Sequence, residues 1–192
     1  LEELTLRSQG WTGAIVPGLL TLQNLTKLDL YGNALTGALG TLQNPNLFSL
    51  NLGNNGFTGS FPSLNQVPLL QTLILSGNGF SGQILSNAFS SASSLNHLES
   101  ADTQFSGSTA AFANHSWSTL ILRGNNFDMC PAPTSTVSAT TTCDFSQQGT
   151  CSGSCYASWS NCQTTTSDVT CVPPSSVPTT NPSSDVTVLP LA

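Results

Sequence analysis

One short pattern recurs six times along this chain at nearly constant spacing. Its clearest copy runs from Leu28 to Gly37, and its general form is Leu-x-Leu-x-x-Asn-x-(Leu or aromatic)-(Thr or Ser)-Gly, with substitutions in some copies. Successive starts are 24, 22, 23, 25 and 22 residues apart. The copies open at Leu4, Leu28, Leu50, Leu73, Leu98 and Leu120. A period of this length is typical of a solenoid in which each repeat forms one turn.

Each copy also carries an apolar residue three positions before the motif. In the resulting Leu-x-x-Leu-x-Leu pattern the last two leucines share one face of a short strand, because side chains alternate along a strand. A single repeat cannot bury such a face, so we expect the repeats to stack in parallel and to share one ladder of leucines. The preceding apolar residues are Leu1, Leu25, Leu47, Leu70, Leu95 and Trp117.

An asparagine follows the strand in four of the copies, at Asn33, Asn55, Asn78 and Asn125. Its side-chain amide is expected to bond main-chain groups of adjacent turns that would otherwise be buried without partners. A glycine column follows and permits backbone angles that other residues resist. The fifth repeat departs from the pattern, since Ser100 replaces a core leucine and Thr103 stands in the asparagine column. We therefore predict a weak point there.

These columns predict an α/β solenoid of the leucine-rich-repeat type. We expect a parallel β-sheet on its concave face and mostly loops with short 3-10 or helical turns on its convex side. Residues 1–129 should form the solenoid of six repeats, residues 130–171 a disulfide-rich C-terminal cap, and residues 172–192 a Pro/Ser/Thr-rich stalk ending in a short apolar strand. A β-sandwich would not require an asparagine at a fixed offset in four copies.

Charge is scarce, because charged residues make up 6% of the chain and the net charge is −6. With three cations in all, the chain is not expected to bind nucleic acid. Serine and threonine together account for 52 of the 192 residues, and chains this rich in hydroxyls commonly carry covalently attached glycans. Asn24 and Asn114 lie in N-glycosylation sequons, although such matches also arise by chance in chains of this composition.

The sequence predicts a secreted or cell-surface protein without a membrane span. No stretch approaches the ~20 apolar residues that a transmembrane helix needs. No cleavable signal peptide is visible. Because Leu1 already occupies a repeat position, we expect the biological start to lie upstream of it.

The cysteines lie together after the last repeat, at Cys130, Cys143, Cys151, Cys155, Cys162 and Cys171. An even number in a Ser/Thr-rich segment predicts three disulfides in an oxidising compartment, with the pairing left open. The alternative of a zinc site has little support, because no Cys-x-x-Cys occurs and neither His97 nor His115 is near. The cross-linked segment should cover the apolar side chains that the last repeat would expose.

The chain ends in a proline-rich stretch followed by an apolar tail from Asp185 to Leu191. Val186 and Val188 alternate as in a strand. At the other end Leu1, Leu4 and Leu6 would form an uncovered strand edge, which invites pairing with another chain. Our assembly hypothesis assigns the contact to these two ends, with Leu1, Leu4, Leu6, Val186, Val188 and Leu191 as its residues.

The residues that follow the glycines carry a resemblance to a known family. Ala14 to Pro17 reads Ala-Ile-Val-Pro, Ser60 to Pro62 reads Ser-Phe-Pro, and Gln83 precedes Ile84. These endings resemble the Leu-x-Gly-x-Ile-Pro signature of plant-type leucine-rich-repeat proteins, which include receptor ectodomains and polygalacturonase-inhibiting proteins. The resemblance covers residues 1 to about 130 and implies a second short strand after each glycine and an extracellular binding role. The chain departs from the family in its few repeats and its unusually low charge.

The variable positions around the strand leucines are expected to line the concave face. Of the nine charged residues within residues 1–129, eight lie in or beside the strand that holds the two leucines of each motif, and only Asp128 does not. In one interpretation the face recognises a partner, since such faces are wide binding surfaces. In the other, the charges lie there because sugars or neighbouring molecules cover the rest of the surface and leave this face exposed. The predicted binding residues are Arg7, Lys27, Asp29, Tyr31, Ile74, His97, Glu99 and Arg123.

Catalysis is not predicted. His97, Glu99 and Asp102 are close in sequence, but they fall in one repeat on an open face without a paired nucleophile or an enclosing pocket. A calcium site at Glu99 and Asp102 would lack oxygen ligands. We expect no cofactor and no metal.

Two functional hypotheses remain. In the first, the chain is a non-enzymatic assembly scaffold that self-associates or binds another extracellular protein, and is joined head to tail in a glycosylated fibre or coat, with the tail adding a strand to a neighbour. In the second, it is a recognition ectodomain that binds a peptide or a polysaccharide on its concave face. The sequence favours the first slightly.

Overall fold

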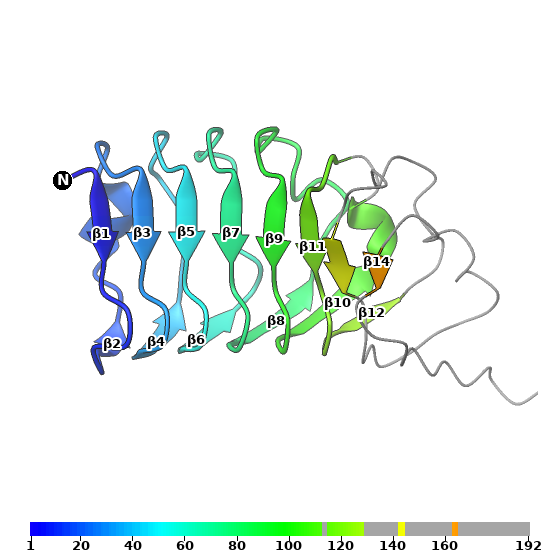
Figure 1. Ribbon diagram of the computed structural model, residues 1–192, viewed down its shortest axis with the longest axis horizontal. Coiled ribbons are helices and arrows are strands. Elements are labelled where there is room, and N and C mark those ends of the chain that lie inside the picture. Colours follow the sequence, from blue (N-terminus) through cyan, green and yellow to red (C-terminus); the bar gives the residue numbers. More distant parts are fainter. Residues whose placement is uncertain (113–114, 129–141, 145–162, 165–192) are drawn as a thin grey trace, which may run out of the picture.

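The leucine and asparagine columns stack into a solenoid of parallel strands (Figure 1). The computed structural model describes residues 1–112, 115–128, 142–144 and 163–164. Each repeat contributes one strand to a first sheet, turns at the asparagine and contributes a second strand to another sheet. Both sheets are parallel throughout the described residues, as one-directional coiling requires.

Within the described part of the chain, the first sheet has eight strands in chain order. They are β1 (Glu3–Thr5), β3 (Lys27–Asp29), β5 (Ser49–Asn51), β7 (Thr72–Ile74), β9 (His97–Glu99), β11 (Thr119–Ile121), β13 (Thr142–Asp144) and β14 (Gln163–Thr164). Equivalent repeat positions pair directly, so that Leu28 lies beside Leu50 and Leu50 beside Leu73. The predicted leucine ladder is therefore confirmed. The sheet continues past the sixth repeat, because β13 pairs with β11.

The second sheet has six strands and a different register. They are β2 (Thr12–Ala14), β4 (Ala34–Ala38), β6 (Gly56–Gly59), β8 (Gly79–Gln83), β10 (Gln104–Ser108) and β12 (Asn126–Asp128). Here each repeat's glycine pairs with the next repeat's apolar residue, as Gly37 does with Phe57 and Gly59 does with Phe80. This sheet confirms the second short strand that the family resemblance implies.

The glycine of the motif is required where these strands meet. Gly59 has a φ of +95°, which residues with a Cβ rarely adopt. A Cβ placed there would also lie 3.2 Å from the Cβ of Ala38 in the preceding turn. The glycine column therefore allows the turns of the second sheet to approach one another closely.

The predicted class needs one correction, because the fold is a β-solenoid rather than an α/β one. The helices of the described residues are two 3-10 turns, η1 (Pro17–Thr21) and η2 (Thr109–Phe112). Two strands already use much of each repeat, and prolines such as Pro45 and Pro62 in the return segments oppose an α-helix. In the described part of the chain, no helix is both long enough and apolar enough to cross a bilayer.

Two layers of side chains fill the space between the sheets. The strand leucines from Leu28 to Leu120 are at most 1% exposed. Behind them Phe57, Phe80 and Phe105 stack with ring centroids 6.1 and 6.0 Å apart. Stacked rings at this separation add to the stabilisation from burial. The core therefore runs continuously through neighbouring turns.

The asparagines form a ladder of hydrogen bonds that joins each turn to the one before it. Asn78 Nδ2 donates to Leu75 O of its own turn at 2.9 Å and to Leu52 O of the preceding turn at 3.0 Å. Its Oδ1 accepts from Phe57 N at 3.0 Å. The predicted bonding to adjacent turns is confirmed. The asparagine ladder comprises Asn33, Asn55, Asn78 and Asn125, which repeat this arrangement.

The fifth repeat carries an imperfection at each of its two substituted positions. Ser100 is fully buried, and its Oγ has no hydrogen-bond partner among the described groups. Thr103 Oγ1 donates to Ser100 O at 3.1 Å and also bonds Asn125 Oδ1, but its shorter side chain lacks the amide's second donor. A buried unpaired hydroxyl costs free energy, in agreement with the predicted weak point.

Several predictions from the sequence fall outside the described residues. They are the disulfides, the sequon residue Asn114, and the tail residues Val186, Val188 and Leu191. Of the cysteines, only the backbone of Cys143 in β13 is described. The domain boundaries at residues 129 and 171 also stay predictions.

Replacing Asn78 with alanine should lower the free energy of unfolding by at least about 2 kcal/mol. The change leaves the buried N–H of Phe57 and the buried carbonyl of Leu75 without their asparagine partner, whereas Leu52 O keeps its hydrogen bond from Asn55 Nδ2. Each group left unpaired costs about 1–3 kcal/mol. Denaturant unfolding followed by circular dichroism measures the effect. Asn65 is exposed, so Asn65→Ala is the matched control and should change stability by less than ~0.5 kcal/mol. Equal effects of the two variants would contradict a structural role for the ladder.

Candidate binding face on the first sheet

The candidate site is the outward face of the first sheet, which we call the first-sheet face. It corresponds to the concave face expected from the sequence. Two columns of side chains cross it, because the strands pair in exact repeat register. One column holds Glu3, Lys27, Ser49, Thr72, His97 and Thr119, and the other holds Thr5, Asp29, Asn51, Ile74, Glu99 and Ile121.

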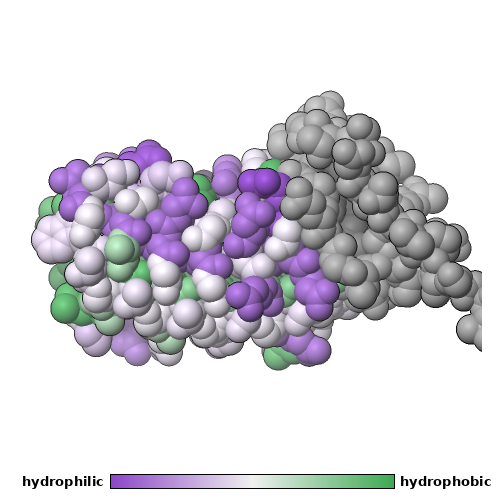
Figure 2. All heavy atoms as spheres, turned by 90° about the horizontal axis from the view of Figure 1, so that it is seen from below, coloured by the Kyte–Doolittle hydropathy of each residue, from purple (hydrophilic) through white to green (hydrophobic). Residues whose placement is uncertain are grey.

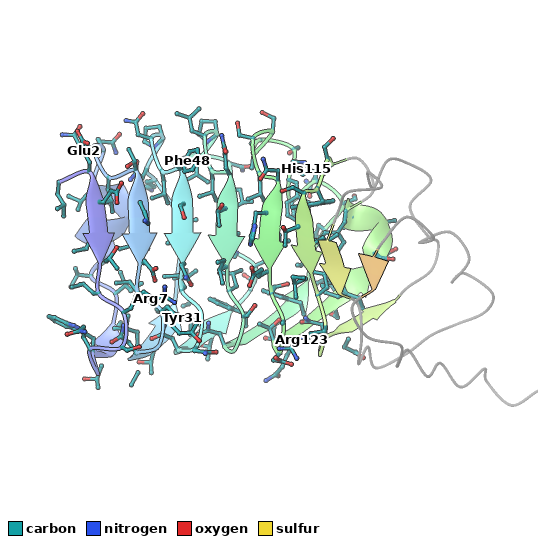
Figure 3. All side chains as sticks on the ribbon, in the orientation of Figure 1. Glu2, Arg7, Tyr31, Phe48, His115 and Arg123 are labelled. Atoms are coloured by element: carbon teal, nitrogen blue, oxygen red, sulfur yellow. The ribbon has the colours of Figure 1, made fainter. Side chains whose placement is uncertain are left out.

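A cluster of polar and aromatic groups lies at the ends of β1 and β3. The guanidinium carbon of Arg7 lies 4.7 Å from the centroid of the Tyr31 ring, and Arg7 Nε lies 3.7 Å from Asp29 Oδ2. Asp29 Oδ1 accepts from Tyr31 N at 3.1 Å. Figure 3 shows Arg7 and Tyr31 beside each other at this edge. A cation–π contact at an exposed site contributes only about 0.5–1 kcal/mol. Its role here is therefore to orient the two side chains rather than to stabilise the fold.

Asn54 belongs to the same cluster, although sequence reasoning did not select it. Its Nδ2 donates to the hydroxyl of Tyr31 at 2.7 Å. Asn54 also has a φ of +52°, a left-handed conformation that asparagine tolerates better than most residues. The sequence signal is the Asn-Asn pair at 54 and 55, in which only the second asparagine belongs to the ladder.

The remaining charges of the face are also paired. Lys27 Nζ lies 3.7 Å from Glu3 Oε2, with both side chains exposed. Arg123 lies 3.0 Å from Asp102 Oδ2 at the lower edge of the sheet, where Figure 3 labels it. Arg7, Lys27 and Arg123 are the only lysines and arginines of the chain, and each pairs with a carboxylate. The face therefore carries charge without presenting a free cation.

The middle of the face is uncharged. We call Ser49, Asn51, Thr72, Ile74 and Ser76 of β5, β7 and the following turn the central strip, and all five are half-buried. Asn51 Oδ1 accepts from Gly53 N at 3.0 Å, and Ser76 Oγ accepts from Ala101 N at 3.0 Å. Ile74 is the apolar member. The strip therefore offers a neutral surface between two regions of paired charge.

His97 is the one histidine in the described strands of this face, and it pairs with an acid. Its Nε2 lies 2.7 Å from Glu99 Oε1. Asp102 pairs with Arg123 instead. Among the described residues, no group of three His, Cys, Asp or Glu side chains is arranged to hold a metal ion. The three acid–base residues grouped in the sequence are thus divided between two separate pairs.

Comparisons with known proteins agree with this architecture. The family model "Leucine Rich Repeat" matches residues 46–66 and 69–91. The receptor-like protein kinase HAIKU2 of Arabidopsis thaliana is 37% identical over 86 residues, which are 44% of this chain and 9% of that protein. The chain therefore spans only a small part of this relative's length.

Solved structures extend the likeness over most of the chain. The BIR2 ectodomain of Arabidopsis thaliana is 33% identical over 69% of this chain and 72% of that one, with a TM-score of 0.59. A plant ice-binding protein has the same fold at 23% identity, with a TM-score of 0.69 over 79% of this chain and 50% of that one. The chain belongs to the plant-type leucine-rich-repeat family.

Replacing Asp29 with alanine should destabilise the protein by about 1.5–3 kcal/mol. Asp29 is 8% exposed, and hydrogen bonds to a charged acceptor of this kind contribute about that much. Denaturant unfolding measures the loss. Lys27→Ala, on the same strand, breaks an exposed ion pair and should cost no more than ~1 kcal/mol. An equal loss in both variants would contradict a special role for the Arg7–Asp29–Tyr31 cluster.

Proposed function

We propose that this chain is a non-enzymatic extracellular binding module whose first-sheet face recognises an extended, uncharged segment of a partner. The observation that carries the proposal is that every lysine and arginine of the chain pairs with a carboxylate on or beside this face. A strongly charged partner would have to disrupt these pairs. A neutral partner can lie on the central strip and leave them intact.

The structural relatives support recognition of a protein or a peptide. One similar structure is that of PEPR1-AtPEP1, to which this chain is 26% identical with a TM-score of 0.66. Another is the BIR3 - SERK2 complex, to which this chain is 30% identical. Several relatives are described as ectodomains, which supports an extracellular location. An open, stacked surface without an enclosing pocket suits binding better than catalysis, because catalysis requires an excluded-water site.

The side chains of the central strip indicate the chemistry of a partner that would fit it. Ile74 supplies an apolar contact at its middle, while Ser49 and Thr72 supply hydroxyl groups. A segment that lies across the strands meets a new turn about every 4.8 Å. It would thus place small polar and apolar side chains against successive turns. A polysaccharide chain presents the same combination of hydroxyls and apolar ring faces, and is the alternative ligand.

Introducing arginine at Ile74 should weaken binding, because it replaces the apolar contact with a long charged side chain in the middle of the neutral strip. A random-peptide phage library panned against the wild-type protein, together with a polysaccharide array, supplies the ligands. We expect enriched ligands to bind Ile74→Arg at least about tenfold more weakly, which corresponds to about 1.4 kcal/mol. Thr58 is exposed on β6 of the second sheet, so Thr58→Arg is the matched control and should bind normally. Ligands that bind Ile74→Arg as well as the wild type would contradict the proposal.

Head-to-tail assembly is the second candidate function, favoured by a specific apolar surface. Among the described residues, nothing covers the first repeat, where Leu1 is 70%, Trp11 54% and Val16 68% exposed. A hollow of about 310 Å³ opens there between Leu6, Trp11, Val16 and Leu35. Figure 2 shows hydrophobic residues gathered at this end of the molecule. Within the described residues, β1 and β2 are end strands of the two sheets, and their outer edges are where an added strand would pair.

If this surface joins copies, the 192-residue chain should sediment as oligomers at high micromolar concentration, and Val16→Glu should sediment as a monomer. The charge would have to be buried in the contact, which is unfavourable. Leu85 is 60% exposed elsewhere on the molecule, so Leu85→Glu is the matched control and should leave the oligomers unchanged. Deleting residues 185–192 tests the tail as the added strand. A monomeric wild-type chain would contradict assembly and leave recognition as the function.

A further inference from the structure

A groove lies along the edge of the first sheet where β1, β3 and β5 begin. It is open to solvent and has a volume of about 790 Å³, which is comparable with the roughly 300–1,000 Å³ of sites that hold small molecules. Figure 3 labels Glu2 and Phe48 at this upper edge of the sheet, away from Arg7 and Tyr31. The lining residues that matter here are Asn24, Thr26, Asn46, Phe48, Ser49 and Leu69.

The groove exposes apolar side chains in an otherwise polar position of the repeat. Phe48 is 47% exposed and Leu69 is 50% exposed. The position of Phe48 is fixed, because Phe48 N donates to Thr26 O at 2.7 Å and Gln71 N donates to Phe48 O at 2.8 Å. The equivalent residues of the other repeats are all polar, namely Glu2, Thr26, Gln71, Asn96 and Ser118. Phe48 and Leu69 therefore form a small exposed apolar patch in this groove.

The sequon Asn24-Leu25-Thr26 forms one wall of this groove. Leu25 is 1% exposed and fixes the segment to the core, whereas Asn24 is exposed. The contrast with Asn46, the equivalent residue of the next repeat, is informative. Asn46 Nδ2 donates to Gln23 O at 2.7 Å, so it is engaged. No hydrogen bond of the Asn24 side chain to another described group is seen, and its amide nitrogen is accessible.

We propose that Asn24 carries an N-linked glycan whose first sugars lie in this groove and cover Phe48 and Leu69. A pyranose ring has an apolar face of C–H groups that packs on an aromatic ring, and a rim of hydroxyls. Asn46 and Ser49 border Phe48 in the groove and supply polar partners for such a rim. The attached sugar is the proposed occupant, because Asn24, to which it would be bonded, itself lines the groove.

The modification balances as a simple group transfer. A lipid-linked oligosaccharyl diphosphate of the secretory pathway supplies the sugar. A bond forms between Asn24 Nδ2 and the anomeric carbon, the bond from that carbon to the diphosphate oxygen breaks, and the lipid diphosphate leaves. Asn24 Nδ2 loses one proton, which passes to the leaving diphosphate or to solvent, and nothing is oxidised or reduced. The inference does not rest on the proposed function, because a glycan on Asn24 that covers Phe48 needs no partner on the central strip, with which the groove shares Ser49 alone.

The test uses the full chain secreted from a eukaryotic host. Intact mass should fall by one glycan in Asn24→Gln and stay unchanged in Thr26→Ser, which keeps both the sequon and the hydroxyl that donates to Glu2 O. Asn114→Gln removes the other sequon and is the matched control. An unchanged mass in Asn24→Gln would overturn the proposed modification.

A second measurement tests whether the glycan covers the groove. Fluorescence of an apolar dye should rise severalfold in Asn24→Gln, return to the wild-type level in Asn24→Gln combined with Phe48→Ser, and stay at that level in Asn114→Gln. Enzymatic release of the glycans from the folded wild type should produce the same rise. Equal dye fluorescence in wild type and Asn24→Gln would show that the sugar leaves Phe48 bare, and would overturn the covering role.

Discussion

The hydrogen bonds of the asparagine ladder are the interaction on which the rest of the structure depends. At the end of each first-sheet strand the chain must turn inward, which carries carbonyls and an N–H into the core without strand partners. One asparagine amide satisfies a carbonyl of its own turn, a carbonyl of the preceding turn and an N–H of that turn. Buried polar groups are expensive to leave unpaired. The ladder therefore fixes the spacing of the turns as well as the position of each bend.

The two sheets follow from this bend but have different registers. The first sheet pairs identical repeat positions, so its outward side chains form straight columns, and like residues can be read along the solenoid. The second sheet pairs a glycine with the next repeat's apolar residue, which lets the phenylalanines stack behind the leucines. A functional surface with ordered columns is therefore a property of the first sheet.

The surface has three regions of different chemistry. The first-sheet face carries paired charges around a neutral central strip, the first repeat exposes apolar side chains, and the upper edge joins an accessible asparagine to an exposed phenylalanine. All three regions are nearly free of unpaired positive charge, because each of the three cations pairs with a carboxylate. Little electrostatic attraction is therefore available for a negatively charged partner. The proposed recognition would depend on shape, hydroxyl groups and apolar contact, which are less sensitive to salt than charge pairs are.

The sequence by itself determined the period, the leucine ladder, the role of the asparagines and the two substituted positions of the fifth repeat. These are local consequences of residues at fixed offsets, and each turn repeats them. It also placed Arg7, Asp29 and Tyr31 on one face. Only the tertiary structure decided that Asn54 completes their cluster, that Asp102 pairs with Arg123, and that Phe48 shares a groove with Asn24. Those contacts join side chains of different turns, and they depend on the register between strands and on side-chain conformation, neither of which a repeat pattern specifies.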